Sequence, residues 1–249
     1  MNLHFACNSC GKCCHGHHIS LTLHEALRWV DDGGLLVILI EAFLENGDGV
    51  PPVQRDHAQR RSLKVRCGGA NAYVTITFAA YNIGTCRFLT KDKRCGIYEH
   101  RPLVCQIYPV EINPHIQLRP EHKDCAPETW DETGPMVYSD GRVVDGALAQ
   151  LIEQSRQADR DDIGYKADIC QELGMDVTAL KGDGFAVYLP DTGILRATIE
   201  AVMKSRSASA PREQEWSFYS SRTEVISQLG AMNASIMKDM PRNATFVPI

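Results

Sequence analysis

The stretch Phe5-Ala-Cys-Asn-Ser-Cys-Gly-Lys-Cys-Cys-His-Gly-His-His18 places four cysteines within eight residues. Two Cys-x-x-Cys steps share Cys10, and Cys14 directly follows Cys13. Thiolates are soft ligands that select zinc, iron–sulfur clusters or cuprous copper. The stretch therefore predicts a metal centre at the heart of a small, irregular core.

Six further cysteines follow, at positions 67, 86, 95, 105, 125 and 170. The N-terminal residues show neither the basic region nor the apolar region of a signal peptide, so we expect a cytoplasmic, reducing compartment. In such a compartment clustered cysteines are metal ligands or redox groups more often than disulfides.

Two ligand templates fit the spacing. A structural zinc site would combine Cys7 and Cys10 with a second pair, either Cys86/Cys95 or Cys105/Cys125. An iron–sulfur cluster of the ferredoxin type would use Cys7, Cys10 and Cys13 with a remote fourth cysteine among 86, 95 and 105.

Neither template accounts for Cys14. Neighbouring side chains point apart on helices and strands, so Cys13 and Cys14 are expected to face different atoms or different centres. This predicts more than one metal ion, either as one cluster plus a second metal or as one multinuclear site. The imidazoles of His15, His17 and His18 could add nitrogen ligands, although histidines beside a centre often lie outside its ligand shell.

Composition excludes several function classes. The 249-residue chain has a net charge of −5, which gives no global attraction to nucleic acid or anionic membranes. The basic run from Arg55 to Arg66 lacks interleaved aromatic residues and is interpreted as a solvated face. The most apolar run, Leu35 to Leu44, is too short to span a bilayer. The expected partner is an unknown redox or protein partner, without nucleic acid or membrane.

Before the second group of cysteines, three elements are expected. Thr22 and Glu25 form a capping box that predicts a helix through Val30. The apolar run Leu35–Glu45 is long enough to favour a buried helix. The β-branched, alternating run Tyr73–Phe78 predicts a strand.

The second group of cysteines lies on short elements. Cys86 and Cys95 are expected at the open end of a hairpin, with Cys125 in a loop. Pro102 predicts a helix start that places Cys105 in the first turn, where amides and the helix dipole lower a thiol pKa. Residues 111–118 are expected to form a strand interrupted at Pro114.

The remainder of the chain carries no recognisable motif. Its pattern predicts a strand at 185–189, a linker at 205–212, and helices at 141–157, 161–173 (with Gly164 as a weak point), 191–204 and 222–240. Cys170 stands alone and is interpreted as a buried apolar residue. The fold class is α+β, with a cysteine-cluster metal-binding domain at 1–128 and a mainly helical companion region at 129–249.

The cysteine pattern resembles that of the YkgJ-type cysteine-cluster family. The residues that carry the likeness are Cys-x-x-Cys-x-x-Cys-Cys, Cys86-x-Phe-Leu, and Cys95-x-Ile-Tyr-x-x-Arg-Pro-x-x-Cys105-x-x-Tyr-Pro109. Relatives have a late Cys-Pro-Glu, from which Cys125-Ala-Pro-Glu128 departs at Ala126. The resemblance covers roughly residues 5–128, and flagellin lysine-N-methylase is similar at a greater distance.

The resemblance implies a zinc- or iron-chelating domain, and many members are labelled iron–sulfur oxidoreductases. It implicates eight metal ligands: Cys7, Cys10, Cys13, Cys14, Cys86, Cys95, Cys105 and Cys125. Cys67 falls between the motif blocks and is left out. Arg101 would orient the helix that presents Cys105 or stabilise thiolate charge.

Three functions are consistent with these residues. The first is an iron–sulfur or iron centre with a redox or cluster-dependent enzymatic role. The second is a zinc-stapled structural or interaction module without catalysis. The third is group transfer of the lysine N-methylase type, against which the chain lacks a Gly-rich nucleotide-binding turn after a strand.

Overall fold

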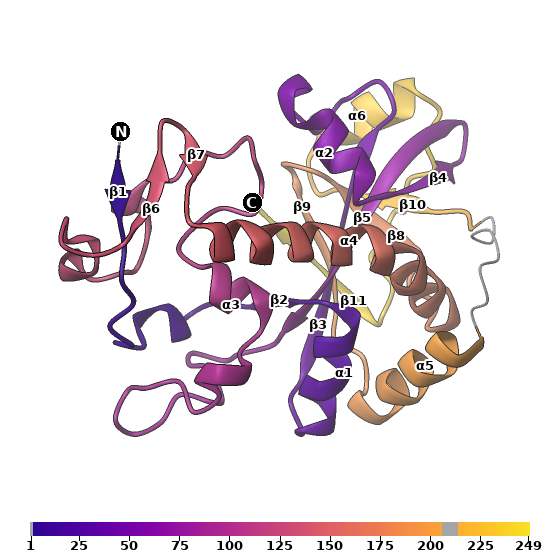
Figure 1. Ribbon diagram of the computed structural model, residues 1–249. Helices are drawn as coiled ribbons and strands as arrows, with labels where there is room; N and C mark the ends of the chain where they lie inside the picture. The colour runs from indigo at the N-terminus through magenta and orange to yellow at the C-terminus, as the bar shows by residue number, and fades with distance from the viewer. Residues whose placement is uncertain (1, 206–213) are drawn as a thin grey trace. The chain divides into compact units, whose positions relative to one another are not determined.

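The computed structural model describes residues 2–205 and 214–249 (Figure 1). Helices and sheets are mixed, which confirms the α+β class. Contacts divide the chain into two units: the cysteine unit, residues Met1–Leu21 and Tyr81–Ala158, and the sheet unit, residues Thr22–Ala80 and Asp159–Ile249. The division expected at residue 128 stays a prediction.

The cysteine unit is built from short elements. A three-stranded antiparallel sheet has the order β1-β6-β7, with bounds Leu3–His4, Met136–Ser139 and Arg142–Val143. Its other elements are strand β2 (Ile19–Leu21), helix α3 (Leu103–Ile107), the start of helix α4 at Gly146, and 3-10 turns at Lys12–Cys14, Tyr98–His100, Pro120–His122 and Pro127–Trp130.

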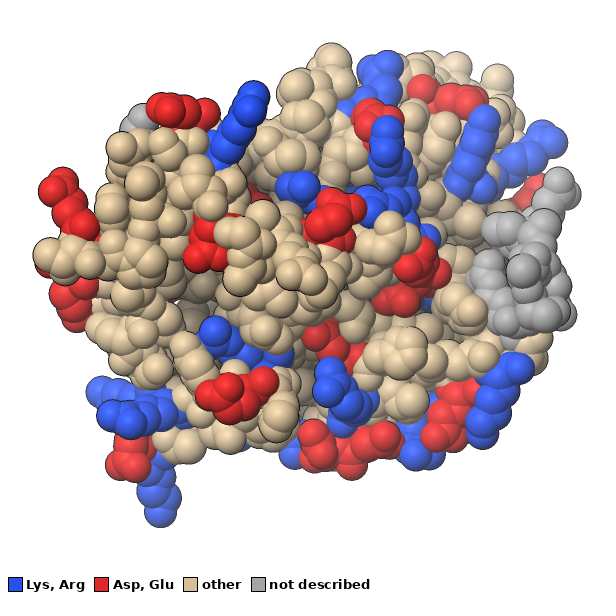
Figure 2. Space-filling view, in the orientation of Figure 1, with Lys and Arg blue, Asp and Glu red and all other residues tan. Residues whose placement is uncertain are grey.

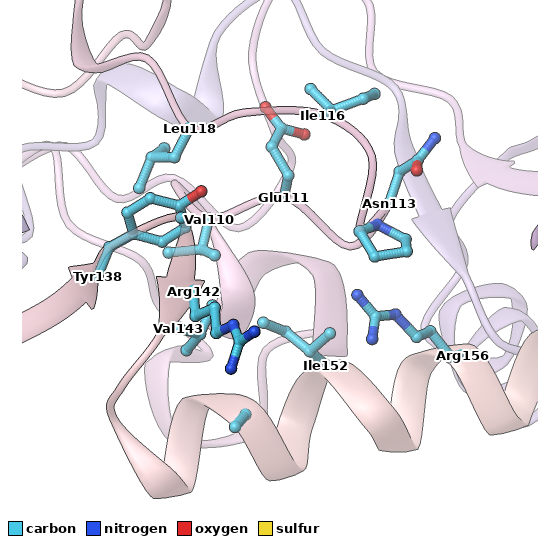
Figure 3. A pocket seen from close by; sticks show the side chains of 13 residues that line it. Val110, Glu111, Asn113, Ile116, Leu118, Tyr138, Arg142, Val143, Ile152 and Arg156 are labelled. Atoms are coloured by element: carbon cyan, nitrogen blue, oxygen red, sulfur yellow. The ribbon is translucent and has the colours of Figure 1, made fainter. Parts of the chain in front are cut away.

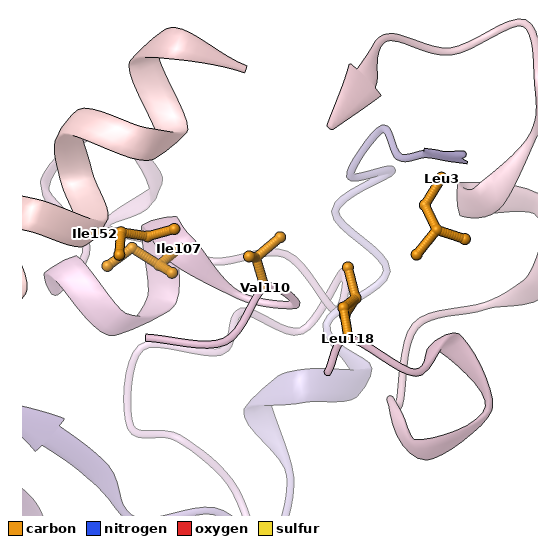
Figure 4. Packing of buried hydrophobic residues seen from close by; sticks show 5 residues of the cluster. All are labelled: Leu3, Ile107, Val110, Leu118 and Ile152. Carbon is orange, nitrogen blue, oxygen red and sulfur yellow. The ribbon is translucent and has the colours of Figure 1, made fainter. Parts of the chain in front are cut away.

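A small apolar cluster holds these elements together (Figure 4). It consists of Leu3, Ile107, Val110, Leu118 and Ile152, each less than a tenth exposed. Full burial of one such side chain stabilises by about 1.5–3 kcal/mol. A core of this size is modest, so additional cross-links between the loops would contribute substantially.

The strand expected at residues 111–118 is wrong. This segment forms turns and bends instead. Pro114 has no N–H for a strand ladder, and the Asn113 side chain accepts the backbone N–H of His115 at 3.0 Å. The local side-chain hydrogen bond and the proline therefore favour a turn over the expected strand.

The sheet unit is organised around strand β3, Leu36–Leu44. It pairs antiparallel with β5 (Ala70–Ala80) along its full length, and β4 (Leu63–Cys67) pairs with β5. Further pairs of β3 are β8 (Val177–Leu180), which is parallel, and β9 (Gly184–Tyr188), which is antiparallel. Strand β10 (Ser217–Tyr219) pairs with β8, and β11 (Ala244–Pro248) pairs with β9.

The helix expected over Leu35–Glu45 is therefore wrong. Eight of the nine residues of β3 are buried, so both faces of the strand are covered. A strand buried on both faces reads as a continuous apolar run without alternation. Length alone favoured a helix, whereas pairing on both edges of β3 makes it a strand. The strands predicted at 73–78 and 185–189 are confirmed as parts of β5 and β9.

Helix α1, Leu23–Asp31, confirms the capping box. Thr22 Oγ1 accepts the N–H of Glu25, and the Glu25 carboxylate accepts the N–H of Thr22. The other helices of the sheet unit are α2 (Arg55–Arg60), α5 (Thr192–Ser205) and α6 (Thr223–Ala231). Of the linker expected at 205–212, only Ser205 lies within the described residues, at the end of α5.

Two helix boundaries differ from expectation. The two helices expected at 141–157 and 161–173 are one continuous helix, α4, over residues 146–172, which also crosses the expected weak point at Gly164. The expected start at residue 141 is wrong, because residues 142–143 form strand β7. On either side of that glycine, buried Asp162 accepts the N–H of Leu23 at 2.7 Å, and buried Lys166 lies 3.9 Å from Asp162. This tertiary anchoring outweighs the low helix propensity of glycine.

The last helix is shorter than expected. α6 ends at Ala231, Asn233 adopts a left-handed φ of 55°, and Ala234 donates to Leu229 O at 3.1 Å. A left-handed residue after the last turn is a common helix stop. Residues 244–248, which follow the expected helix, form strand β11, which was not expected from the sequence.

The basic run 55–66 is largely paired. Arg60 contacts Asp56, Arg61 contacts Asp159, and Lys64 contacts Glu45. Figure 2 shows Lys and Arg interspersed with Asp and Glu over the face in view, without a broad patch of one sign. Among the described residues, no helix is long and apolar enough to cross a membrane.

Candidate metal centre

The first four candidate ligands lie on a tight, side-chain-supported turn in the cysteine unit. The Asn8 side chain accepts the N–H of Cys10 at 3.2 Å, and the Cys7 sulfur accepts the N–H of Ser9 at 3.4 Å. Ser9 has a left-handed φ of 58°. Local hydrogen bonds of this kind replace regular secondary structure and reverse the chain within a few residues. The turn thereby gathers the four sulfurs in one region.

Gly11 allows this turn to meet the loop that carries Cys95. It has a φ of 70°, and a Cβ at this position would lie only 2.4 Å from Lys93 O. A side chain here would thus be excluded both by backbone conformation and by contact with another backbone segment. The glycine between Cys10 and Cys13 is required by the approach of residues 86–95.

Residues 86–95 form a compact loop. Only one antiparallel bridge, Leu89 to Cys95, joins its two sides, so the expected hairpin is reduced to a turn without named strands. Cys86 donates its backbone N–H to Cys14 O at 2.7 Å, and Gly16 donates to Gly84 O at 2.7 Å. These backbone bonds hold Cys86 directly beside Cys14.

The thiols of Cys13, Cys14 and Cys86 form a hydrogen-bonded trio. Cys14 acts as the shared donor, so its pKa is raised, while the pKa of Cys13 falls to about 7 and that of Cys86 to about 6. The expectation that Cys13 and Cys14 point apart is not met, because they end a 3-10 turn and their sulfurs interact. Two thiols of the trio are thus prepared as anions near neutral pH.

Cys105 lies in α3, in the first turn after Pro102, as expected. Its pKa is nevertheless raised to about 12, first by burial and then by the nearby charges of Cys13, Cys86 and Cys95. The expected lowering by the helix dipole is therefore wrong, since a five-residue helix has a weak dipole and the thiol is desolvated.

Arg101 supplies positive charge to the cysteines. Its guanidinium carbon lies 3.9 Å from the centre of the Tyr98 ring, and its charge lowers the pKa of both Cys13 and Cys105. The stacked position fixes a cation near thiols that would otherwise repel one another. Of the two roles expected for Arg101, stabilisation of thiolate charge has this electrostatic support.

Cys125 belongs to a polar group that sequence reasoning did not assign. The Tyr108 hydroxyl hydrogen bonds the Cys125 sulfur and accepts the N–H of Asp124 at 2.8 Å. His17 Nε2 lies 2.7 Å from Asp124 Oδ2. Tyr108 falls within the Tyr-Pro of the family pattern, and Asp124 precedes a candidate ligand, so both were detectable as neighbours of the motif. Burial raises the pKa of Cys125 to about 12.

The structure brings all eight candidate cysteines into one neighbourhood, here called the thiol cluster. Besides burial, the charges of Cys13, Cys86 and Cys95 raise the pKa of Cys105. The charges of Cys13, Cys7 and Cys10 raise the pKa of Cys125. Cys13 therefore affects the pKa of both Cys105 and Cys125. Within residues 2–205 and 214–249, no set of three or more His, Cys, Asp or Glu side chains has the closed geometry of a metal site.

Cys67, Cys170 and His18 have other surroundings. Cys67 and Cys170 are fully buried in the sheet unit, where desolvation raises the pKa of each. His18 Nδ1 accepts the N–H of Asn82 at 3.4 Å and its ring stacks on Tyr81. The prediction that Cys67 and Cys170 are not ligands is consistent with these positions.

The donor set fits a soft metal. Eight thiols, a neighbouring imidazole and a nearby guanidinium provide anionic sulfur ligands and partial charge compensation. Such a set suits zinc or iron and disfavours magnesium or calcium, which prefer oxygen ligands. The thiol cluster and its irregular supporting loops thus define a cysteine-rich metal-chelating domain.

The comparison with protein families names that domain. Residues 6–126 match the model of the CxxCxxCC family, described as a "putative zinc- or iron-chelating domain". The chain carries a domain of this family, which confirms the resemblance inferred from the cysteine pattern and supports metal binding. No curated protein and no solved structure shows a significant match to the chain.

Proposed function

We propose that the thiol cluster holds an iron–sulfur or iron centre with a redox or cluster-dependent role. The observation that supports this most strongly is the convergence of four chain segments, carrying eight cysteines, on one region of the cysteine unit. The chain would bind its centre in a reducing, cytoplasmic compartment, where the thiols stay unpaired.

The residues around the cysteines have separate tasks in this proposal. Cys13, whose charge raises the pKa of both Cys105 and Cys125, would be a ligand of the iron–sulfur centre. Arg101 would offset the negative charge of the bound thiolates, and Tyr108 would hold Cys125 through its hydroxyl. A centre of this kind supplies one-electron chemistry, and its potential depends on charge and hydrogen bonds around the sulfurs.

Zinc binding is the second candidate. The charges of Cys7 and Cys10 raise the pKa of Cys125, and those of Cys86 and Cys95 raise the pKa of Cys105. This grouping into two sets suits two closed sites. Eight cysteines are enough for two four-cysteine zinc ions, which would staple the loops without catalysis.

Anaerobic purification followed by metal analysis, sulfide determination and a visible spectrum separates these candidates. A coloured protein with iron and acid-labile sulfide supports the iron–sulfur proposal, and iron without sulfide supports a mononuclear or multinuclear iron site. Colourless protein with stoichiometric zinc and neither iron nor sulfide would end the iron proposal in favour of the zinc module.

A further inference from the structure

A cavity of about 400 Å³ opens in the cysteine unit and is lined by residues outside the thiol cluster (Figure 3). Its walls come from the segment after α3, from β6 and β7, and from the first turns of α4. No cysteine lines it. Cavities that bind small organic ligands begin at about this size.

The base of the cavity is apolar. Val110, Leu118 and Ile152 line it and are all buried members of the small core. They come from two separate elements and belong to one packed cluster, so this wall is held in place before any ligand arrives. An apolar group entering the cavity would lose water-exposed surface against a preformed wall, which favours binding by about 25 cal/mol per Å².

Two guanidinium groups flank this apolar base. Figure 3 shows Arg142 of β7 and Arg156 of α4 projecting toward the hollow on either side of Ile152. Arg156 is fixed in place because its Nε donates to Ile112 O at 2.8 Å. Arg142 is exposed and has no ion-pair partner among the described residues.

The acidic groups nearby do not cancel these charges. Glu111 also lines the cavity, but its carboxylate is 2.5 Å from Lys123 Nζ. Glu153 approaches Arg156 only at 3.9 Å and is itself mostly exposed, so this contact is weak. The cavity therefore presents apolar surface together with an uncompensated positive charge.

We propose that this cavity binds a small organic carboxylate with an apolar body. The apolar part would lie on Val110, Leu118 and Ile152, and the carboxylate would pair with Arg142 and the free edge of Arg156. Arginine suits this task because its planar donor pairs match the two oxygens of a carboxylate. The proposal goes beyond metal binding and does not depend on which metal the thiol cluster holds.

The test uses the full chain as purified, with 4-phenylbutyrate as the probe and isothermal titration or ligand-observed NMR as the readout. The neutral analogue 4-phenylbutyramide removes the charge, and acetate removes the apolar body. We expect saturable binding of 4-phenylbutyrate that is weakened at least about tenfold in either analogue, because both the ion pair and apolar burial contribute.

Variants locate the site. Arg142→Gln is expected to weaken 4-phenylbutyrate binding by about tenfold or more, because it removes an exposed charge without touching the core. Ala149→Trp, which fills the cavity from α4, is expected to weaken it while both arginines remain. Arg28→Gln, an exposed arginine of the sheet unit, is the charge-matched control and should bind as the original chain does.

Three results would overturn the proposal. One is the absence of saturable binding below about 10 mM, where a specific ion pair and apolar contact should already be visible. The second is equal binding of the acid and the amide. The third is unchanged binding in Arg142→Gln with circular dichroism matching the original chain.

Discussion

At the scale of single residues, Cys13 occupies the central position of the thiol cluster. It hydrogen bonds with Cys14, and its negative charge raises the pKa of both Cys105 and Cys125. A ligand shared between two sides of a site contributes to both, so its loss should affect the whole centre rather than one half.

Replacing Cys13 by Ser should therefore remove most of the bound metal. Inductively coupled plasma mass spectrometry on anaerobically purified protein measures this loss. Cys170→Ala is the matched control, because Cys170 is fully buried in the sheet unit and should leave metal content unchanged. Full metal occupancy in Cys13→Ser would contradict the central position.

Cys14→Ser extends the same experiment. Because the sulfurs of Cys13 and Cys14 interact directly, equal metal loss in the two variants would indicate one shared site. Unequal losses would support the expectation of more than one metal ion.

Arg101 is predicted to tune thiol reactivity. Arg101→Gln removes a cation that lowers the pKa of Cys13, so less Cys13 thiolate should exist at pH 7. The Cys14 hydrogen bond, the main cause of the lowered pKa, would remain. The alkylation rate of Cys13 in metal-free protein, followed by iodoacetamide labelling and mass spectrometry, should therefore fall without being abolished. Arg94→Gln, an exposed arginine of the 86–95 loop, serves as control. An unchanged rate in Arg101→Gln would show that the guanidinium is irrelevant to Cys13.

At the scale of elements, the N-terminal cap of α1 is the most clearly defined local contribution. Thr22→Ala removes the side-chain acceptor for Glu25 N–H and should lower the free energy of unfolding by about 1 kcal/mol. Chemical denaturation checks this. Thr198→Ala is the control, since the Thr198 hydroxyl only bonds back to Ile194 O within α5 and its loss should be nearly neutral. Equal effects in both variants would contradict the capping role.

The elements that the sequence predicted correctly are those with a local cause. The Thr22–Glu25 capping box and the alternation at 73–78 act within a few residues, and both were confirmed. Strand β3 was misassigned because its conformation depends on three partner strands remote in sequence. The continuity of α4 likewise depends on Asp162 bonding to Leu23, which no local pattern reveals.

The eight candidate ligands came from the family resemblance, and the family match covers them. Their role as metal ligands stays a prediction, and the detail of their surroundings was less predictable. The high pKa of Cys105 was not predictable, because burial and neighbouring thiols outweigh its place in a helix turn. The contacts of Tyr108 and His17 with Asp124 join segments remote in sequence, so spacing alone could not pair them.

At the scale of the whole molecule, the cysteines divide into two groups with opposite effects on stability. Cys13 and Cys86 have pKa values lowered to about 7 and about 6 in the folded protein. Their contribution to the free energy of unfolding is therefore fully present above pH 9, the unfolded pKa, and is lost as the pH falls through 7 and 6. The pKa values of Cys67, Cys105 and Cys125 are raised to about 12, so their contribution is present below pH 9 and lost as pH rises toward 12.

The thiol-dependent stability of reduced, metal-free protein should therefore be greatest near pH 9. Denaturant unfolding at a series of pH values under anaerobic conditions measures it. The double variant Cys105→Ala/Cys125→Ala should make the alkaline decline shallower, with Cys67 still contributing, while keeping the rise between pH 6 and 9. A decline of unchanged steepness in that variant would mean that other groups cause it.

The chain between Cys105 and Cys125 would belong to both proposed sites. Its ends carry candidate metal ligands, and its middle supplies Val110 and Leu118 to the cavity beside α4. Fixing both ends to one centre would restrict this segment as a cross-link does, which for loops of comparable length is worth about 3 kcal/mol. If metal binding also orders the cavity wall, reciprocity requires that an organic acid in the cavity strengthen metal binding. The domain would then be most stable when metal and acid are bound together.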